Sequence, residues 1–95
     1  MITKGTENYK RASELANELM RLANVSRRDT SYFDLAFEKL GRALNEVSGT
    51  GTFAADIAKT VDSTMNVYGG QVAKLSTKQA WCLACCMVEL GIGVK

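Results

Sequence analysis

The 95-residue chain contains no histidine and no proline. Without histidine, the Ser-His and Cys-His nucleophile pairs and every histidine-ligated metal site are excluded. Without proline, no helix interior loses an amide donor, and turns depend on glycine, serine, threonine and asparagine. A glycine-rich phosphate loop and a convergent pair of carboxylates are also missing from the sequence, which argues against catalysis. We therefore expect a protein that is not an enzyme and that has no cofactor.

Neither sign of charge is in clear excess, since 12 Lys and Arg stand against 10 Asp and Glu. This balance neither requires nor excludes nucleic acid, because clustering of charge matters more than the total. The three cysteines are an odd number and indicate no disulfide framework. Residues 1–6 lack the apolar run of a secretory signal, and the longest apolar segment is too short to cross a bilayer. We expect a cytoplasmic protein without a membrane partner.

Apolar residues recur at steps of three and four in four segments, which is the spacing of one buried helical face. The pattern predicts helices at about 6–24, 29–47, 53–68 and 76–91. No segment alternates in the manner of a strand, and Gly69-Gly70 is expected to end the third helix. The sequence therefore predicts a single domain over residues 1–95, folded as a compact all-α bundle of about four helices.

The last predicted helix has a strong start signal and few polar residues. Ser76 and Gln79 have the spacing of a capping box, in which each side chain binds the backbone N–H of the other residue. Between residues 80 and 90 only Glu89 is charged, so every face of the helix is apolar and needs cover. We expect this helix to be central, with the first three helices laying their apolar stripes on it.

Three short helices are too few to cover such a helix and also to bury their own stripes. This count predicts that the chain forms a homodimer or a larger homo-oligomer. Met87, Leu90 and Ile92 are the residues that we expect nearest to the seam.

The cysteines are the first candidate for chemistry. On a helix Cys82 and Cys86 lie one turn apart on one face, with Cys85 beside them, so three thiolates could hold a metal ion at a subunit interface. No fourth ligand is in sight, and Cys82 lies too far inside the helix for the low pKa of a redox Cys-x-x-Cys pair. Free cysteine is among the most buried residue types. Packing is the preferred interpretation, a metal-linked oligomer the next and redox chemistry the last.

The second candidate is the turn between the first two helices. Arginines beside free backbone N–H groups at a helix start suit a phosphate, of nucleic acid or of a nucleotide. The alternative, which we favour, is a solvated turn in which Asp29 is the counter-charge. The residues assigned to phosphate contact are Arg21, Arg27, Arg28, Lys74 and Lys78.

The same turn resembles the helix-turn-helix of DNA-binding proteins. Asn24-Val25-Ser26 fits the turn, and Phe33 fits a later apolar position of the second helix. Met20 stands where the motif has a small residue, and Thr30 stands where it has an aliphatic one. The resemblance covers about a fifth of the chain and implies a nucleic-acid partner.

The segment Lys74-Leu75-Ser76-Thr77-Lys78-Gln79-Ala80-Trp81 resembles one that recurs near the ends of small phage and prophage accessory proteins. Part of the match is a capped helix start, which the physical interpretation explains unaided. The resemblance implies a protein that acts in the host cytoplasm by binding, for example by inhibiting a host enzyme or a defence complex. We expect a binding or inhibitory module that acts through protein–protein interaction, with nucleic-acid or nucleotide binding as the alternative.

Overall fold

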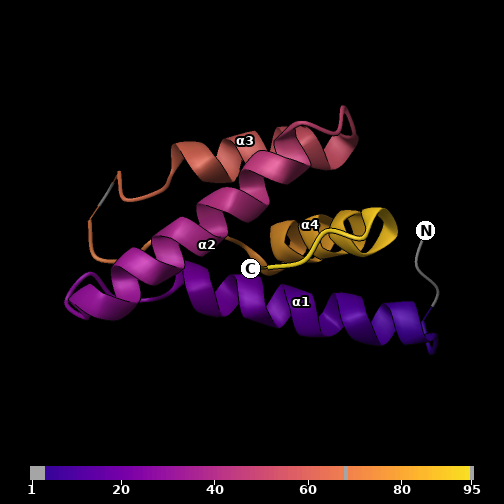
Figure 1. Cartoon of the computed structure of the whole chain (residues 1–95), viewed down its shortest axis with the longest axis horizontal. Helices are drawn as coiled ribbons and strands as arrows, with labels where there is room; N and C mark the ends of the chain where they lie inside the picture. The colour runs from indigo at the N-terminus through magenta and orange to yellow at the C-terminus, as the bar shows by residue number, and fades with distance from the viewer. Residues whose placement is uncertain (1–3, 68, 95) are drawn as a thin grey trace.

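The computed structural model describes residues 4–67 and 69–94, and four helices account for most of them (Figure 1). These are α1 (Glu7–Ala23), α2 (Thr30–Ser48), α3 (Phe53–Ser63) and α4 (Thr77–Leu90). Within the described residues the only strand-like pairing is an isolated antiparallel bridge between Ser26 and Gln71. The predicted all-α bundle is confirmed.

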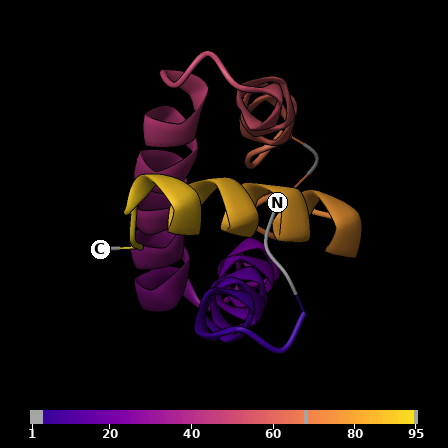
Figure 2. The same ribbon diagram turned by 90° about the vertical axis from the view of Figure 1, so that its right-hand side faces the viewer.

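The helices are arranged around α4, which lies between α1 and α3. Figure 2 shows α1 and α3 nearly end-on, on opposite sides of α4, while α2 runs beside α4 from one to the other. Helix α4 packs chiefly on α1 and then on α3, whereas α2 packs chiefly on α3 and α1 and touches α4 little. The expectation that all three stripes lie on α4 is therefore wrong for α2.

The core is continuous and apolar, and no polar or charged side chain of the described residues is buried in it. The buried faces of α1 and α2 follow the periodicity of their sequences, whereas α3 buries Ala54, Ala55, Ala58 and Val61. Burial of apolar area is the main source of stability. The largest fully buried side chains are Leu19 of α1, Leu40, Leu44 and Val47 of α2, Val61 of α3, Leu83 and Met87 of α4, and Val72 of the segment before α4.

Side chains cap the starts of α1 and α4. The Thr6 hydroxyl accepts the Tyr9 N–H at 3.2 Å. The predicted capping box of α4 is confirmed, because the Ser76 hydroxyl accepts the Gln79 N–H at 3.1 Å and the Gln79 side-chain oxygen accepts the Ser76 N–H at 3.0 Å. Helix α4 ends at Gly91, whose φ of 71° lies in the left-handed region that favours glycine.

Helix α3 ends at Ser63, five residues before the predicted end at 68. Asn66 has a φ of 53°, and its N–H donates to the Val72 carbonyl at 2.7 Å instead of continuing the helix. Met65 is nevertheless buried. The apolar periodicity therefore predicted its burial correctly, although the backbone at Met65 is not helical. Tyr68 lies outside the described residues, and the predicted glycine cap at Gly69-Gly70 is wrong because the helix has already ended.

An extended link, residues 70–73, runs beside the turn between α1 and α2. The Arg27 N–H donates to the Gly70 carbonyl at 2.9 Å, and the Ala73 N–H donates to the Ala23 carbonyl at 3.1 Å. Val72 and Ala73 are buried in the core. The link therefore ties the start of α4 to the turn that carries the predicted basic residues.

One side of α4 is not covered by the rest of the chain. Trp81, Cys82, Cys85 and Val88 are partly exposed, and Leu90 is half exposed. Helices α1 and α3 and the core cover only part of its circumference, so the chain alone does not supply all the cover that this apolar helix was expected to need. Over residues 4–67 and 69–94, none of the helices has the length and hydropathy required to span a membrane.

Candidate functional site

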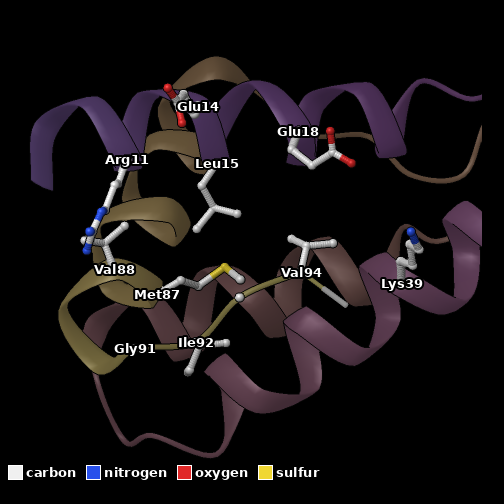
Figure 3. Close-up of a pocket in the computed structure, with 11 residues that line it drawn as sticks. Arg11, Glu14, Leu15, Glu18, Lys39, Met87, Val88, Gly91, Ile92 and Val94 are labelled. Carbon is white, nitrogen blue, oxygen red and sulfur yellow. The ribbon is translucent and has the colours of Figure 1, made fainter. Parts of the chain in front are cut away.

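A groove of about 510 Å³ lies between α1, α2 and the chain that follows α4, and is here called the tail groove. Leu15 of α1 points into it from above, and Met87 and Val94 lie opposite (Figure 3). Val88 and Ile92 complete the apolar floor. The Ile92 N–H donates to the Met87 carbonyl at 2.8 Å, which fixes the tail against the end of α4. The groove thus has an ordered apolar floor at the surface.

Charged side chains surround this floor. Arg11 reaches down at one end of the groove and Lys39 rises from α2 at the other, while Glu14 and Glu18 lie along the α1 edge (Figure 3). Arg11 also pairs with Glu7 at 3.1 Å. Such a surface suits an apolar group that is flanked by charges of both signs.

The best-defined electrostatic interaction at the groove involves Glu18. Its side chain accepts hydrogen bonds from Arg21, which lower the pKa of the carboxyl group. Partial burial opposes this shift, and the charges of Arg21 and Lys39 support it. The same pairing raises the pKa of Arg21, so Glu18 stays ionised and acts as a fixed negative charge on the rim.

A second recess of about 280 Å³ lies where the start of α3 meets the uncovered side of α4. Phe53, at the start of α3, is 78% exposed beside it. Trp81, Cys82 and Cys85 line the recess from α4. The Tyr9 ring packs against Trp81 at a centroid distance of 5.1 Å, which holds the indole in place. This surface is apolar and shallow, as are many surfaces that bind proteins.

The three cysteines differ in their surroundings. Cys86 is buried, and its sulfur lies 3.6 Å from the Thr52 hydroxyl, which agrees with the packing interpretation. Cys82 and Cys85 are partly exposed. Burial raises the pKa of the Cys85 thiol, and the neighbouring Cys82 and Glu89 raise it further. Among the described residues, no group of three or more His, Cys, Asp or Glu side chains is placed to hold a metal ion.

The third recess, of about 430 Å³, brings together two of the predicted phosphate-contact segments. It is lined by Thr64, Gly69, Gly70 and Lys74, and the guanidinium of Arg27 lies beside Gly69. Gly69 and Gly70 both have positive φ, so the backbone at this point is exposed without a side chain. We call this recess the basic hollow.

The remaining predicted basic residues do not join the basic hollow. The Arg21 side chain is held by Glu18 on the last turn of α1. The Arg28 backbone N–H donates to the Ser26 hydroxyl at 3.2 Å, and Lys78 is exposed on the first turn of α4. The predicted set of five therefore divides, with Arg27 and Lys74 at the hollow and the others elsewhere.

The exposed side of α2 does not favour the helix-turn-helix interpretation. Asp34 and Glu38 are both exposed on α2, and Glu38 pairs with Arg42 at 2.6 Å. A recognition helix approaches a polyanion, so acidic side chains on its exposed side oppose binding.

The predicted seam residues are also separated. Met87 is 1% exposed and lies inside the core, so it offers almost no surface to a second subunit. Leu90 is 50% exposed, and Ile92 is partly buried in the floor of the tail groove. The burial of Met87 follows from its position on the side of α4 that faces the other helices.

Sequence reasoning missed the tail groove and the exposure of Phe53. The groove joins residues from both ends of the chain, and no local spacing signals such a meeting. Phe53 fits the apolar periodicity of α3 but stands at its first residue, beyond the end of the buried face. In comparisons with known proteins, the chain matches no family model, no curated protein and no solved structure.

Proposed function

We propose that the protein is a non-catalytic module that binds another protein in the cytoplasm, and that the tail groove is its binding surface. The observation that carries this proposal is the ordered apolar floor of Leu15, Val88 and Val94 between charged rims. The partner segment would insert one apolar side chain into the floor. Its neighbours would be an acidic residue facing Lys39 or Arg11 and a basic residue facing Glu14 or Glu18.

Two features favour a protein over a small metabolite as the occupant. The groove is lined by both apolar and charged side chains, and its charges are spread along the edges rather than converging on one point (Figure 3). A segment of a protein presents charges at such spacing, whereas a compact metabolite requires polar groups that converge on it. The likeness of Lys74–Trp81 to a segment of small phage accessory proteins supports an inhibitory role toward a host protein.

The test compares two valine substitutions. Val94→Asp places a carboxylate in the floor of the groove, while Val67→Asp makes the same change at an exposed valine outside it. Partners captured from a lysate by the unmodified protein are identified, purified and titrated against both variants. We expect Val94→Asp to raise the Kd at least tenfold, about 1.4 kcal/mol, because the carboxylate must be desolvated.

The Val67→Asp variant should bind as the unmodified protein does, and circular dichroism should show that both variants keep their helices. Equal binding by the two variants would refute the groove as the binding surface.

A second candidate function is supported by the basic hollow. Lys74 and two glycines line it, the guanidinium of Arg27 lies beside Gly69, and no acidic residue is among the residues that line the recess. A phosphate of a nucleotide or nucleic acid fits this chemistry.

If the hollow binds phosphate, binding of a single-stranded oligonucleotide should weaken as salt rises. Arg27→Ala should lower both the affinity and the salt slope, measured by fluorescence anisotropy, while Lys59→Ala on the exposed side of α3 should leave both unchanged. Equal salt slopes for the two variants would exclude the hollow.

A further inference from the structure

Four side chains form one stripe along the uncovered side of α4, at Lys78, Cys82, Cys85 and Glu89. Their steps of four, three and four residues keep them within about 60° of one another around the helix axis. Lys78 and Glu89 are exposed, and the two thiols between them are partly exposed. In Figure 2 this helix crosses in front of α2. The stripe therefore carries a positive charge at one end, a negative charge at the other and two small apolar groups in the middle.

This order of groups is complementary to the same order in an antiparallel copy of the helix. Lys78 and Glu89 lie equally far, in opposite directions, from the point midway between Cys82 and Cys85. Two antiparallel copies of α4 related by a two-fold axis through that point would therefore place Lys78 opposite the partner's Glu89. The same axis places Cys82 opposite the partner's Cys85, and it sets the two helix dipoles head to tail.

We propose that the uncovered side of α4 is the interface with a second copy of this chain, packed antiparallel about that axis. The charge complementarity of the stripe selects this occupant, because a parallel arrangement would place Lys78 against Lys78 and Glu89 against Glu89. Cysteine is a small side chain, so the two helices can approach closely at the axis.

The surroundings of the stripe fit an interface of this kind. Phe53 is 78% exposed beside the recess lined by Trp81, Cys82 and Cys85, and a second copy would cover this apolar surface. Charged pairs would then lie at the rim and apolar groups at the centre, the usual anatomy of an interface. The tail groove lies against Met87 and Val88, on another side of α4, so this proposal does not depend on the proposed function.

The register can be tested by forming disulfides between copies. One variant keeps only Cys82 (Cys85→Ala with Cys86→Ala), and the other keeps only Cys85 (Cys82→Ala with Cys86→Ala). Diamide takes two electrons and two protons from a pair of thiols, so one S–S bond forms and diamide becomes the hydrazine. In the proposed register Cys82 faces Cys85, whereas like residues are displaced by about 4.5 Å along the axis.

We expect the mixture of the two variants to form covalent dimers several-fold faster than either variant alone. A disulfide requires Cα atoms no more than about 7 Å apart, and the displacement places like cysteines at this limit. A variant that cross-links with itself as fast as the mixture does would overturn the antiparallel register.

A charge exchange tests the same register in reduced protein. Glu89→Lys should weaken self-association by roughly tenfold, measured by sedimentation, since it sets two like-charged pairs across the axis. Adding Lys78→Glu should restore the affinity, a result that an effect on folding alone would not give. Both positions are exposed, so the variants should fold. A mass near 10.3 kDa for the unmodified protein at high micromolar concentration would refute the interface.

Discussion

At the scale of single residues, Cys85 is the thiol whose chemistry is most affected by its surroundings. Its pKa is raised from the ordinary value of 9.0, first by burial and then by the neighbouring Cys82 and Glu89. Since the thiolate is the nucleophile, Cys85 should be a slow thiol near neutral pH even though it is partly exposed. The Cys85 thiol is therefore accessible to a reagent but reacts with it slowly.

We predict that Glu89→Gln speeds the alkylation of Cys85 between about pH 8 and 10, because removing the negative charge lowers the thiol pKa. Rates of iodoacetamide labelling, followed for each cysteine by mass spectrometry, measure the change. Asp62→Asn removes an exposed carboxylate on α3 and should leave the Cys85 rate unaltered. Unchanged labelling of Cys85 in the Glu89→Gln variant would show that the charge has no influence.

The same shift has a consequence for stability. A thiol with a raised pKa in the folded state binds its proton more tightly there than in the unfolded chain. Its contribution to the free energy of unfolding is therefore complete below the unfolded pKa, near 9.0, and is lost as the pH rises through the folded pKa.

At the scale of elements, local signals predict how helices begin better than how they end. The capping box of α4 depends on two residues three positions apart, Ser76 and Gln79, so the sequence alone identifies it. The end of α3 depends on Asn66, whose N–H bonds to Val72 across the link. Because that partner becomes available only after the chain folds back, the periodicity of residues 53–68 could not reveal the early end.

The same distinction applies to the candidate sites. Arg27 and Lys74 could be chosen from the sequence as basic residues beside turns, but their placement near one recess depends on the link pairing with the turn after α1. The tail groove depends on the packing of α1 against the chain after α4, and no spacing within either segment encodes it. Residue types were therefore predictable, whereas the distances between them were not.

The outer side of α4 shows a further limit of pattern reasoning. An apolar run indicates that a helix needs cover, but it does not indicate which side the chain itself covers. In the fold, Ala80, Leu83, Ala84 and Met87 point inward, while Cys82 and Cys85 do not. This division leaves Met87 inside the core and Cys82, Cys85 and Glu89 on the uncovered side of the helix.

At the scale of the whole molecule, stability should depend on the centre of α4, since that helix lies between α1 and α3 (Figure 2). Leu83 is fully buried there, whereas Leu35 of α2 is 47% exposed. The same substitution at both sites therefore separates the effect of core packing from the effect of shortening a helical leucine.

We predict that Leu83→Ala lowers the free energy of unfolding by about 2–5 kcal/mol, because it removes buried methyl groups and leaves a cavity among α1, α3 and α4. Such a loss is a large share of the roughly 5–15 kcal/mol that stabilises a domain, and each kcal/mol should lower the Tm by about 4–8 °C. Leu35→Ala should change stability by less than about 1 kcal/mol. Urea unfolding of both variants, followed by circular dichroism, measures the difference. Equal losses at the two positions would mean that α4 is not the centre on which the bundle depends.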